Sequence, residues 1–158
     1  MKKINWKTLL VCMAIPLTIG AVSGFVTHGG MEEMKLMEKP PLSPPDWLFP
    51  VVWTILYSLM GIASYLVLKS DAPQKSIENA LKLYGVQLLF NFFWTIWYFN
   101  LQAFFFSFGW LVVLWIMILV MTVMFFRISK PAGYMLLPYL LWVGFAGYLN
   151  LGVAVLNR

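Results

Sequence analysis

Charged residues are scarce in this chain. Of its 158 residues only 11% are charged, and one is a histidine, whereas ordinary globular chains carry about 25% charged residues. So few charges cannot cover the surface of a water-soluble domain of this size, which excludes a soluble fold, a disordered chain and a nucleic-acid-binding module. The single cysteine, Cys12, can form no internal disulfide. A disulfide scaffold is therefore excluded as well, and the redox compartment stays undetermined.

Ionisable side chains are absent from the interior of the apolar runs. All six carboxylates lie in expected loops or at their edges, and His28 stands at the end of the first apolar run. A charge at the centre of a bilayer is costly and usually marks a pump or a proton-coupled carrier. The sequence therefore predicts no metal site, no haem held by two histidines of one chain, no Ser-His-Asp arrangement and no transport by a fixed charge relay.

Hydrophobic residues, by contrast, make up 61% of the chain. They number about 96, which is close to five membrane spans of about 20 residues each. We therefore expect an all-α integral membrane bundle of five transmembrane helices that forms a single domain over residues 1–158. The expected spans are about 8–26, 47–68, 81–99, 104–126 and 132–156, and the loop at about 27–46 is long enough to form an outer lid.

Three segments of the sequence indicate where expected spans begin or end. Asn100-Leu101-Gln102 is the only polar interruption between the third and fourth runs, and it predicts a tight turn because one unbroken helix would be too long for a single crossing. Asp46 follows two prolines and is expected to cap the second span. The first run resembles a secretory signal in its Ala21-Val22-Ser23 segment. Its length and the Gly20-x-x-x-Gly24 spacing favour instead a helix that a neighbour approaches closely.

The basic residues indicate the topology. Five spans would collect eight of them on the side of the N-terminus, namely Lys2, Lys3, Lys7, Lys69, Lys75, Lys82, Arg127 and Lys130. The other side would receive only Lys35, Lys39 and Arg158. By the positive-inside rule the N-terminus is then cytoplasmic and the C-terminus is outside.

Uncharged polar and aromatic residues recur at helical spacing in three of the expected spans. They are Trp53 and Tyr57 in the second, Gln87, Asn91, Trp94 and Tyr98 in the third, and Trp142, Phe145, Ala146, Leu149 and Asn150 in the fifth. Amide side chains in hydrocarbon seek partners, so they should face the bundle interior. One interpretation is that these residues only hold the helices together. The other is a cavity walled by indoles, closed by the outer loop and suited to a flat apolar ligand.

Several ordered segments resemble the TspO/MBR family, which comprises the bacterial tryptophan-rich sensory proteins and the mitochondrial translocator protein. The similarity covers nearly the whole chain. The segments are Lys39-Pro40, Pro44-Pro45-Asp46-Trp47, Pro50-Val51-Val52-Trp53-Thr54, Leu56-Tyr57-Ser58-Leu59-Met60-Gly61, Gln87-Leu88-Leu89-Phe90-Asn91, and Leu137-Pro138-Tyr139-Leu140-Leu141-Trp142 through Leu149-Asn150.

This resemblance implies a receptor-like or translocator-like protein, commonly a homodimer, in a bacterial cytoplasmic membrane. Its pocket would bind porphyrins such as protoporphyrin IX, haem-type tetrapyrroles and benzodiazepine-type ligands, and it would require no cofactor. Trp53 and Trp142 match the paired pocket indoles, which would be the catalytic residues if the protein degrades porphyrins with light and oxygen. Further ligand-binding positions carried over from the family or from the aromatic stripe are Tyr57, Asn91, Trp94, Phe106, Phe145, Ala146 and Leu149.

The chain departs from the family pattern around the lid. Glu33-Met34 stands where many relatives have Trp-Tyr, Leu42 replaces a tryptophan, and Phe106 occupies the place of another. Tyr148 is followed by no basic residue before Arg158, so specific sterol binding is not expected. Three functions stay open: a tetrapyrrole-binding protein, a light- and oxygen-dependent porphyrin-degrading enzyme, and a membrane scaffold without a small ligand.

Overall fold

All regular elements of the described chain are helices. The computed structural model describes residues 3–158, so Lys2 of the predicted basic side lies outside the described residues. The all-α class is therefore confirmed for this part of the chain. The elements are α1 (Trp6–Val26), α2 (His28–Met34), α3 (Leu48–Leu68), α4 (Gln74–Thr95), the π-helix η1 (Ile96–Asn100), α5 (Phe104–Ile128) and α6 (Lys130–Leu156).

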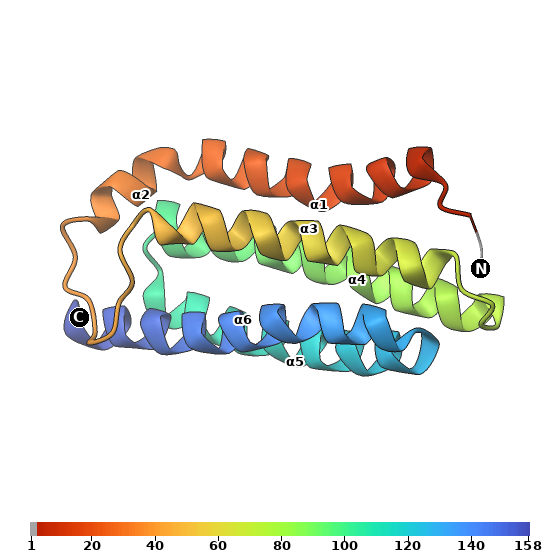
Figure 1. Ribbon diagram of the computed structural model, residues 1–158. Helices are drawn as coiled ribbons and strands as arrows, with labels where there is room; N and C mark the ends of the chain where they lie inside the picture. The colour runs from red at the N-terminus through yellow and green to blue at the C-terminus, as the bar shows by residue number, and fades with distance from the viewer. Residues whose placement is uncertain (1–2) are drawn as a thin grey trace.

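Five long helices lie side by side in a bundle (Figure 1). Going around it, α1 packs on α3, α3 on α6, α6 on α5, and α5 on α4, which also contacts α3 and α1. The N-terminus and the C-terminus lie at opposite ends of the bundle (Figure 1). α1 packs mainly on α3 and less extensively on α4 among the other four long helices.

Four helices are long and apolar enough to cross a membrane, namely α1, α3, α5 and α6. Their bounds agree with the expected spans to within about three residues, the usual uncertainty at helix ends. α4 has 22 residues, but its first turns are polar, and it does not reach the same apolarity. The structure thus shows a multi-pass arrangement with four candidate spans, and the fifth span belongs to the proposals below.

The third predicted span is the one whose limits differ most. Its helix begins at Gln74, seven residues before the predicted start at Leu81, and continues as the π-helix η1 to Asn100. Ile77 and Ala80 are buried although their neighbours are polar, so the first turns form an amphipathic extension that a search for apolar runs misses. The predicted turn after Asn100 is confirmed, and Gln102 there adopts a left-handed φ of 50°.

The outer loop contains a helix that the sequence did not predict. α2 follows α1 almost directly and packs on η1. The prediction that Asp46 caps α3 is wrong: the position before the helix is Trp47, no side chain caps α3, and Asp46 pairs with Lys39 at 3.4 Å. The Asp46 carboxylate therefore links two points of the loop before α3 and does not cap the helix.

Close contact between α1 and α3 depends on two glycines. A Cβ added to Gly20 would lie 2.6 Å from the ring of Tyr57, and one added to Gly61 would lie 2.6 Å from the Cα of Met13. Gly24, the second residue of the predicted small-residue pair, has no neighbouring atom within 4 Å. The predicted close approach is thus found at Gly20 and not at Gly24.

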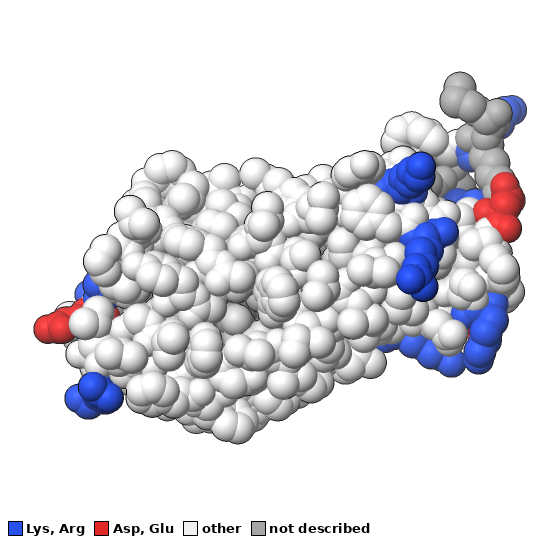
Figure 2. Space-filling model, turned by 90° about the horizontal axis from the view of Figure 1, so that it is seen from below, with Lys and Arg blue, Asp and Glu red and all other residues white. Residues whose placement is uncertain are grey.

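Charges lie at the two ends of the bundle, and the long middle is free of them on the face seen in Figure 2. Basic side chains gather at the end that carries the N-terminus, where the α3–α4 and α5–α6 connections also lie (Figures 1 and 2). Such a band between two charged ends is the surface expected of a protein embedded in a bilayer.

Candidate functional site

A network of uncharged polar groups ties three helices together in the interior. Tyr57 of α3 donates from Oη to Asn91 Oδ1 (3.2 Å), and Asn91 Nδ2 donates to Tyr139 Oη of α6 (2.7 Å). Tyr139 Oη donates in turn to Gln87 Oε1 (2.7 Å). Gln87 and Asn91 stand four apart on α4 and are completely buried, so both amides face the interior as expected.

A second polar contact lies nearer the end of the bundle that carries α2. Trp94 Nε1 of α4 donates to Asn150 Oδ1 of α6 (3.0 Å), and Asn150 Nδ2 donates to the Phe104 carbonyl at the start of α5 (2.9 Å). The ring of Trp94 stacks on Tyr98 of η1, with centroids 5.1 Å apart. The π-helix therefore carries an aromatic ring that extends the interior stripe beyond α4.

The two predicted indoles lie on neighbouring helices and differ in their surroundings. Trp53 of α3 is half-buried and contacts the rings of Tyr57 (5.4 Å between centroids) and Tyr139 (6.2 Å). Trp142 of α6 contacts Phe49 at the start of α3 (5.8 Å) and Phe145 on its own helix (5.7 Å). Trp53 thus packs against the polar network, whereas Trp142 bridges α3 and α6.

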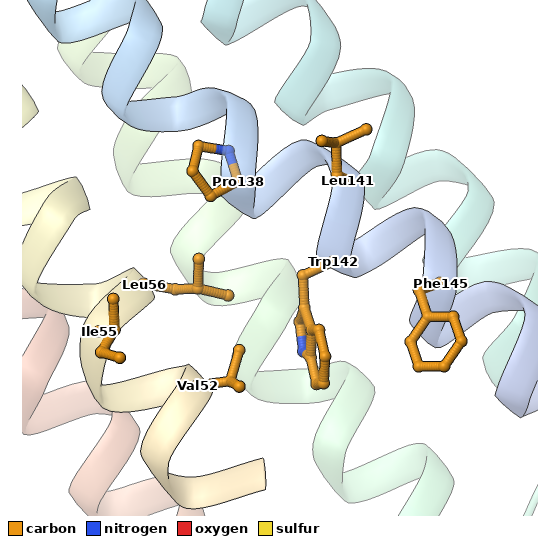
Figure 3. Close-up of a pocket in the computed structure, with 7 residues that line it drawn as sticks. All are labelled: Val52, Ile55, Leu56, Pro138, Leu141, Trp142 and Phe145. Carbon is orange, nitrogen blue, oxygen red and sulfur yellow. The ribbon is translucent and has the colours of Figure 1, made fainter. Parts of the chain in front are cut away.

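An open groove lies between α3 and α6, and Trp142 projects into it (Figure 3). Its volume of about 490 Å³ falls within the range of about 300–1,000 Å³ that small-molecule sites occupy. No charged side chain lines it. We call it the α3–α6 groove, and its lining residues are Val52, Ile55, Leu56, Pro138, Leu141, Trp142 and Phe145.

The structure divides most of the predicted site residues between the bundle interior and the α3–α6 groove. Tyr57, Asn91, Trp94, Ala146 and Leu149 are all buried in the interior, and Trp142 and Phe145 line the groove.

Phe106 does not join this group. It is 56% exposed on α5, where it contacts the rings of Trp97 (5.7 Å) and Trp110 (6.1 Å). It therefore belongs to a separate aromatic cluster on the outer surface of α4, η1 and α5.

Two ion pairs join charged groups of the segment between α1 and α3, away from the interior. Lys35 pairs with Glu32 at 3.1 Å, and Lys39 pairs with Asp46 at 3.4 Å, all on exposed side chains. Within residues 3–158 no three His, Cys, Asp or Glu side chains come together in a way that could hold a metal ion. The interior site is therefore built from aromatic rings, amides and phenols.

Tyr139 is the main site residue that the sequence reasoning missed. It is completely buried, bonds to two amides of α4 and contacts Trp53. A signal was present, because Tyr139 lies three residues before Trp142 and continues the same helical stripe toward the N-terminus.

Taken together, apolar spans, charged ends and an uncharged aromatic interior define a polytopic helical membrane protein. Comparison with known proteins makes this more specific. The profile of the TspO/MBR family matches residues 12–156, and the chain belongs to this family.

Curated relatives agree with this assignment. The chain is similar to the tryptophan-rich protein TspO of Chlorobaculum tepidum, with 38% identity over 151 residues that cover 95% of this chain and 96% of the relative. It is 34% identical to the tryptophan-rich sensory protein of Cereibacter sphaeroides over 121 residues, or 77% and 74% of the two chains. It is 31% identical to the translocator protein of Bos taurus over 151 residues, or 92% and 87%.

Proposed function

We propose that this protein binds tetrapyrroles such as protoporphyrin IX, and other planar apolar molecules, against Trp142 and the neighbouring aromatic interior. The observation that carries the proposal is the α3–α6 groove, which is apolar throughout and walled by an indole. A flat conjugated ring gains burial and offset stacking from such a wall, at about 0.5–1.5 kcal/mol per aromatic pair beyond area burial. Relatives named as translocator and sensory proteins are consistent with a binding role.

We further infer that α4 also crosses the membrane, which gives five spans. At 22 residues it is about 33 Å long, enough for the hydrocarbon core. Its amides, which would be costly in lipid, are buried inside the bundle, where Gln87 and Asn91 bond to Tyr139. With the basic end in the cytoplasm, the N-terminus lies inside and the α2 end lies outside. A homodimer in a bacterial cytoplasmic membrane stays a prediction from the family resemblance.

A fluorescence titration tests the binding proposal. Protoporphyrin IX is added in the dark to the full-length protein in lipid nanodiscs, and quenching of tryptophan emission is followed. We expect saturable quenching, and we expect Trp142→Phe to raise Kd about three- to tenfold, which corresponds to the loss of one good stacking contact. Trp6→Phe is the matched control, because Trp6 is exposed at the opposite end of the bundle and its loss should leave Kd unchanged. Absence of saturable quenching in the parent protein would refute the proposal.

Illumination of the same samples separates a binding protein from the light-dependent enzyme. Degradation would bleach the porphyrin, produce a new pigment and disappear in Trp53→Phe and Trp142→Phe. A binding protein would leave the porphyrin spectrum unchanged apart from its bound shift.

A further inference from the structure

The water-facing outer end of the bundle is closed by a bonded segment. Residues Glu38–Pro41, which we call the strap, lie along the end of α6. Asn157 holds the backbone of Glu38 from both sides: the Glu38 N–H donates to Asn157 Oδ1 (3.0 Å), and Asn157 Nδ2 donates to the Glu38 carbonyl (2.8 Å). Tyr148 Oη donates to the Pro41 carbonyl (2.6 Å). Pro40 packs so closely on Gly152 that an added Cβ would lie 2.5 Å from its ring.

The other half of the outer loop is also fixed. Asn100 Nδ2 donates to the Val26 carbonyl (3.2 Å), and Gln102 Nε2 donates to Glu33 Oε2 (3.0 Å). These bonds join α2 and the end of α1 to the α4–α5 connection, and Met34 of α2 is buried in the hydrophobic core. A ligand that arrived from the water at this end would have to break several hydrogen bonds and displace packed side chains.

The lipid-facing side between α3 and α6 offers no such obstacle. Ile55 is 54% exposed and Leu141 is 73% exposed at the α3–α6 groove. Among the described residues no hydrogen bond joins α3 directly to α6, whereas α6 is bonded to α4 through Tyr139 and to α5 through Asn150. The direct contacts between this pair of helices are apolar and aromatic, and lipid tails or an apolar ligand can replace such contacts at little cost at the groove.

A proline inside α6 locally weakens the α6 side of the groove. Pro138 lines the groove, and a proline inside a helix removes one backbone hydrogen bond and permits a bend.

The groove also lies in the outer half of the bundle, because Val52 is only one turn beyond the start of α3 at Leu48. An amphipathic planar molecule could therefore keep its polar edge at the headgroup level while its ring enters the groove.

We propose that planar apolar ligands reach Trp142 sideways from the bilayer, through the α3–α6 groove, while the strap keeps the water-facing end shut. This inference rests on the proposed function, since it assigns the access route of the same ligand. The lipid-facing mouth of the groove is then the entrance to the site, and the strapped end stays closed.

Rate measurements on full-length protein in lipid nanodiscs test the route. Binding of protoporphyrin IX is followed through the change in porphyrin absorbance, so that added tryptophans do not disturb the signal. Leu141→Trp and, from the opposite wall, Ile55→Trp should obstruct the groove. We expect each to slow association by about tenfold, because a bulky side chain across the lipid-facing mouth obstructs entry. Kd is recorded alongside, because Leu141 and Ile55 also line the proposed site.

Two controls complete the design. Leu151→Trp places the same substitution on α6 in the separate groove between α5 and α6, and it should leave both rates unchanged. Asn157→Ala removes the two bonds to Glu38 and loosens the strap, and in the sideways route it should also leave both rates unchanged.

The outcomes are distinct. Unchanged rates in both groove variants, or a severalfold faster association in Asn157→Ala, would overturn the sideways route and favour access through the outer end. A Kd weakened through faster dissociation alone, with association unchanged in Leu141→Trp and Ile55→Trp, would also overturn the route, because these side chains would then contact the bound ligand without obstructing its entry. If the parent protein shows no binding in this assay, the proposed function itself fails, independently of the route.

Discussion

At the scale of single residues, the hydroxyl of Tyr139 links two buried amides of α4. It accepts a hydrogen bond from Asn91 and donates one to Gln87, so Tyr139→Phe leaves two buried amides short of a partner. We expect the substitution to lower the free energy of unfolding by about 1–2 kcal/mol, measured as a lower thermal unfolding midpoint in detergent. Tyr134→Phe is the control on the same helix, since Tyr134 is 62% exposed. Equal midpoints for the two variants would contradict the role assigned to the network.

The sequence predicted the amides of this site better than its rings. Asn91 and Gln87 could be placed in the interior because an amide exposed to hydrocarbon is costly, and this reasoning does not depend on packing details. Phe106 could not be placed in this way. An aromatic ring is stable in the interior, in lipid or at the interface, and only the three-dimensional arrangement shows that it sits beside Trp97 and Trp110.

At the scale of elements, the contact between α1 and α3 depends on the absence of a side chain at Gly61. A Cβ there would lie 2.6 Å from the Cα of Met13, which is backbone and cannot rotate away. Gly61→Ala should therefore push α1 outward and lower the free energy of unfolding by about 1–3 kcal/mol, seen as a lower midpoint of thermal unfolding. Gly24→Ala is the matched control on α1, because it meets no atom within 4 Å and alanine favours the helix. A midpoint for Gly61→Ala equal to that of Gly24→Ala would refute this account.

The helices could be predicted from the sequence wherever an apolar run and a helix have nearly the same limits. α1, α3, α5 and α6 are apolar along their length, so their apolar runs and their helices have nearly the same limits. The first turns of α4 and the whole of α2 give no apolar run in the sequence, because such helices need only a buried stripe or a neighbour to pack on. The π-helix η1 left no signal in the sequence that the periodicity argument could use.

At the scale of the whole molecule, the distribution of basic residues between the two ends of the bundle is linked to the number of helices that cross the membrane. The basic residues gather at one end of the bundle (Figure 2), and the chain starts at that end and finishes at the other (Figure 1). Opposite termini require an odd number of crossings, whereas the apolarity of the helices alone identifies four. The crossing of α4 therefore decides the topology.

Cysteine labelling on both sides of α4 tests this crossing directly. In a Cys12→Ala background, Lys75→Cys places a thiol at the start of α4, and Leu101→Cys places one after η1; both positions are exposed. We expect a membrane-impermeant maleimide added to intact cells to label Leu101→Cys and to reach Lys75→Cys only after permeabilisation, because a helix of 22 residues separates the two sites by the thickness of the hydrocarbon core. Glu33→Cys, on α2, should label like Leu101→Cys. The unmodified chain, with its buried Cys12, should remain unlabelled in intact cells. Labelling of Lys75→Cys and Leu101→Cys from the same side would mean that α4 does not cross, which would leave four spans and place both termini on one side of the membrane.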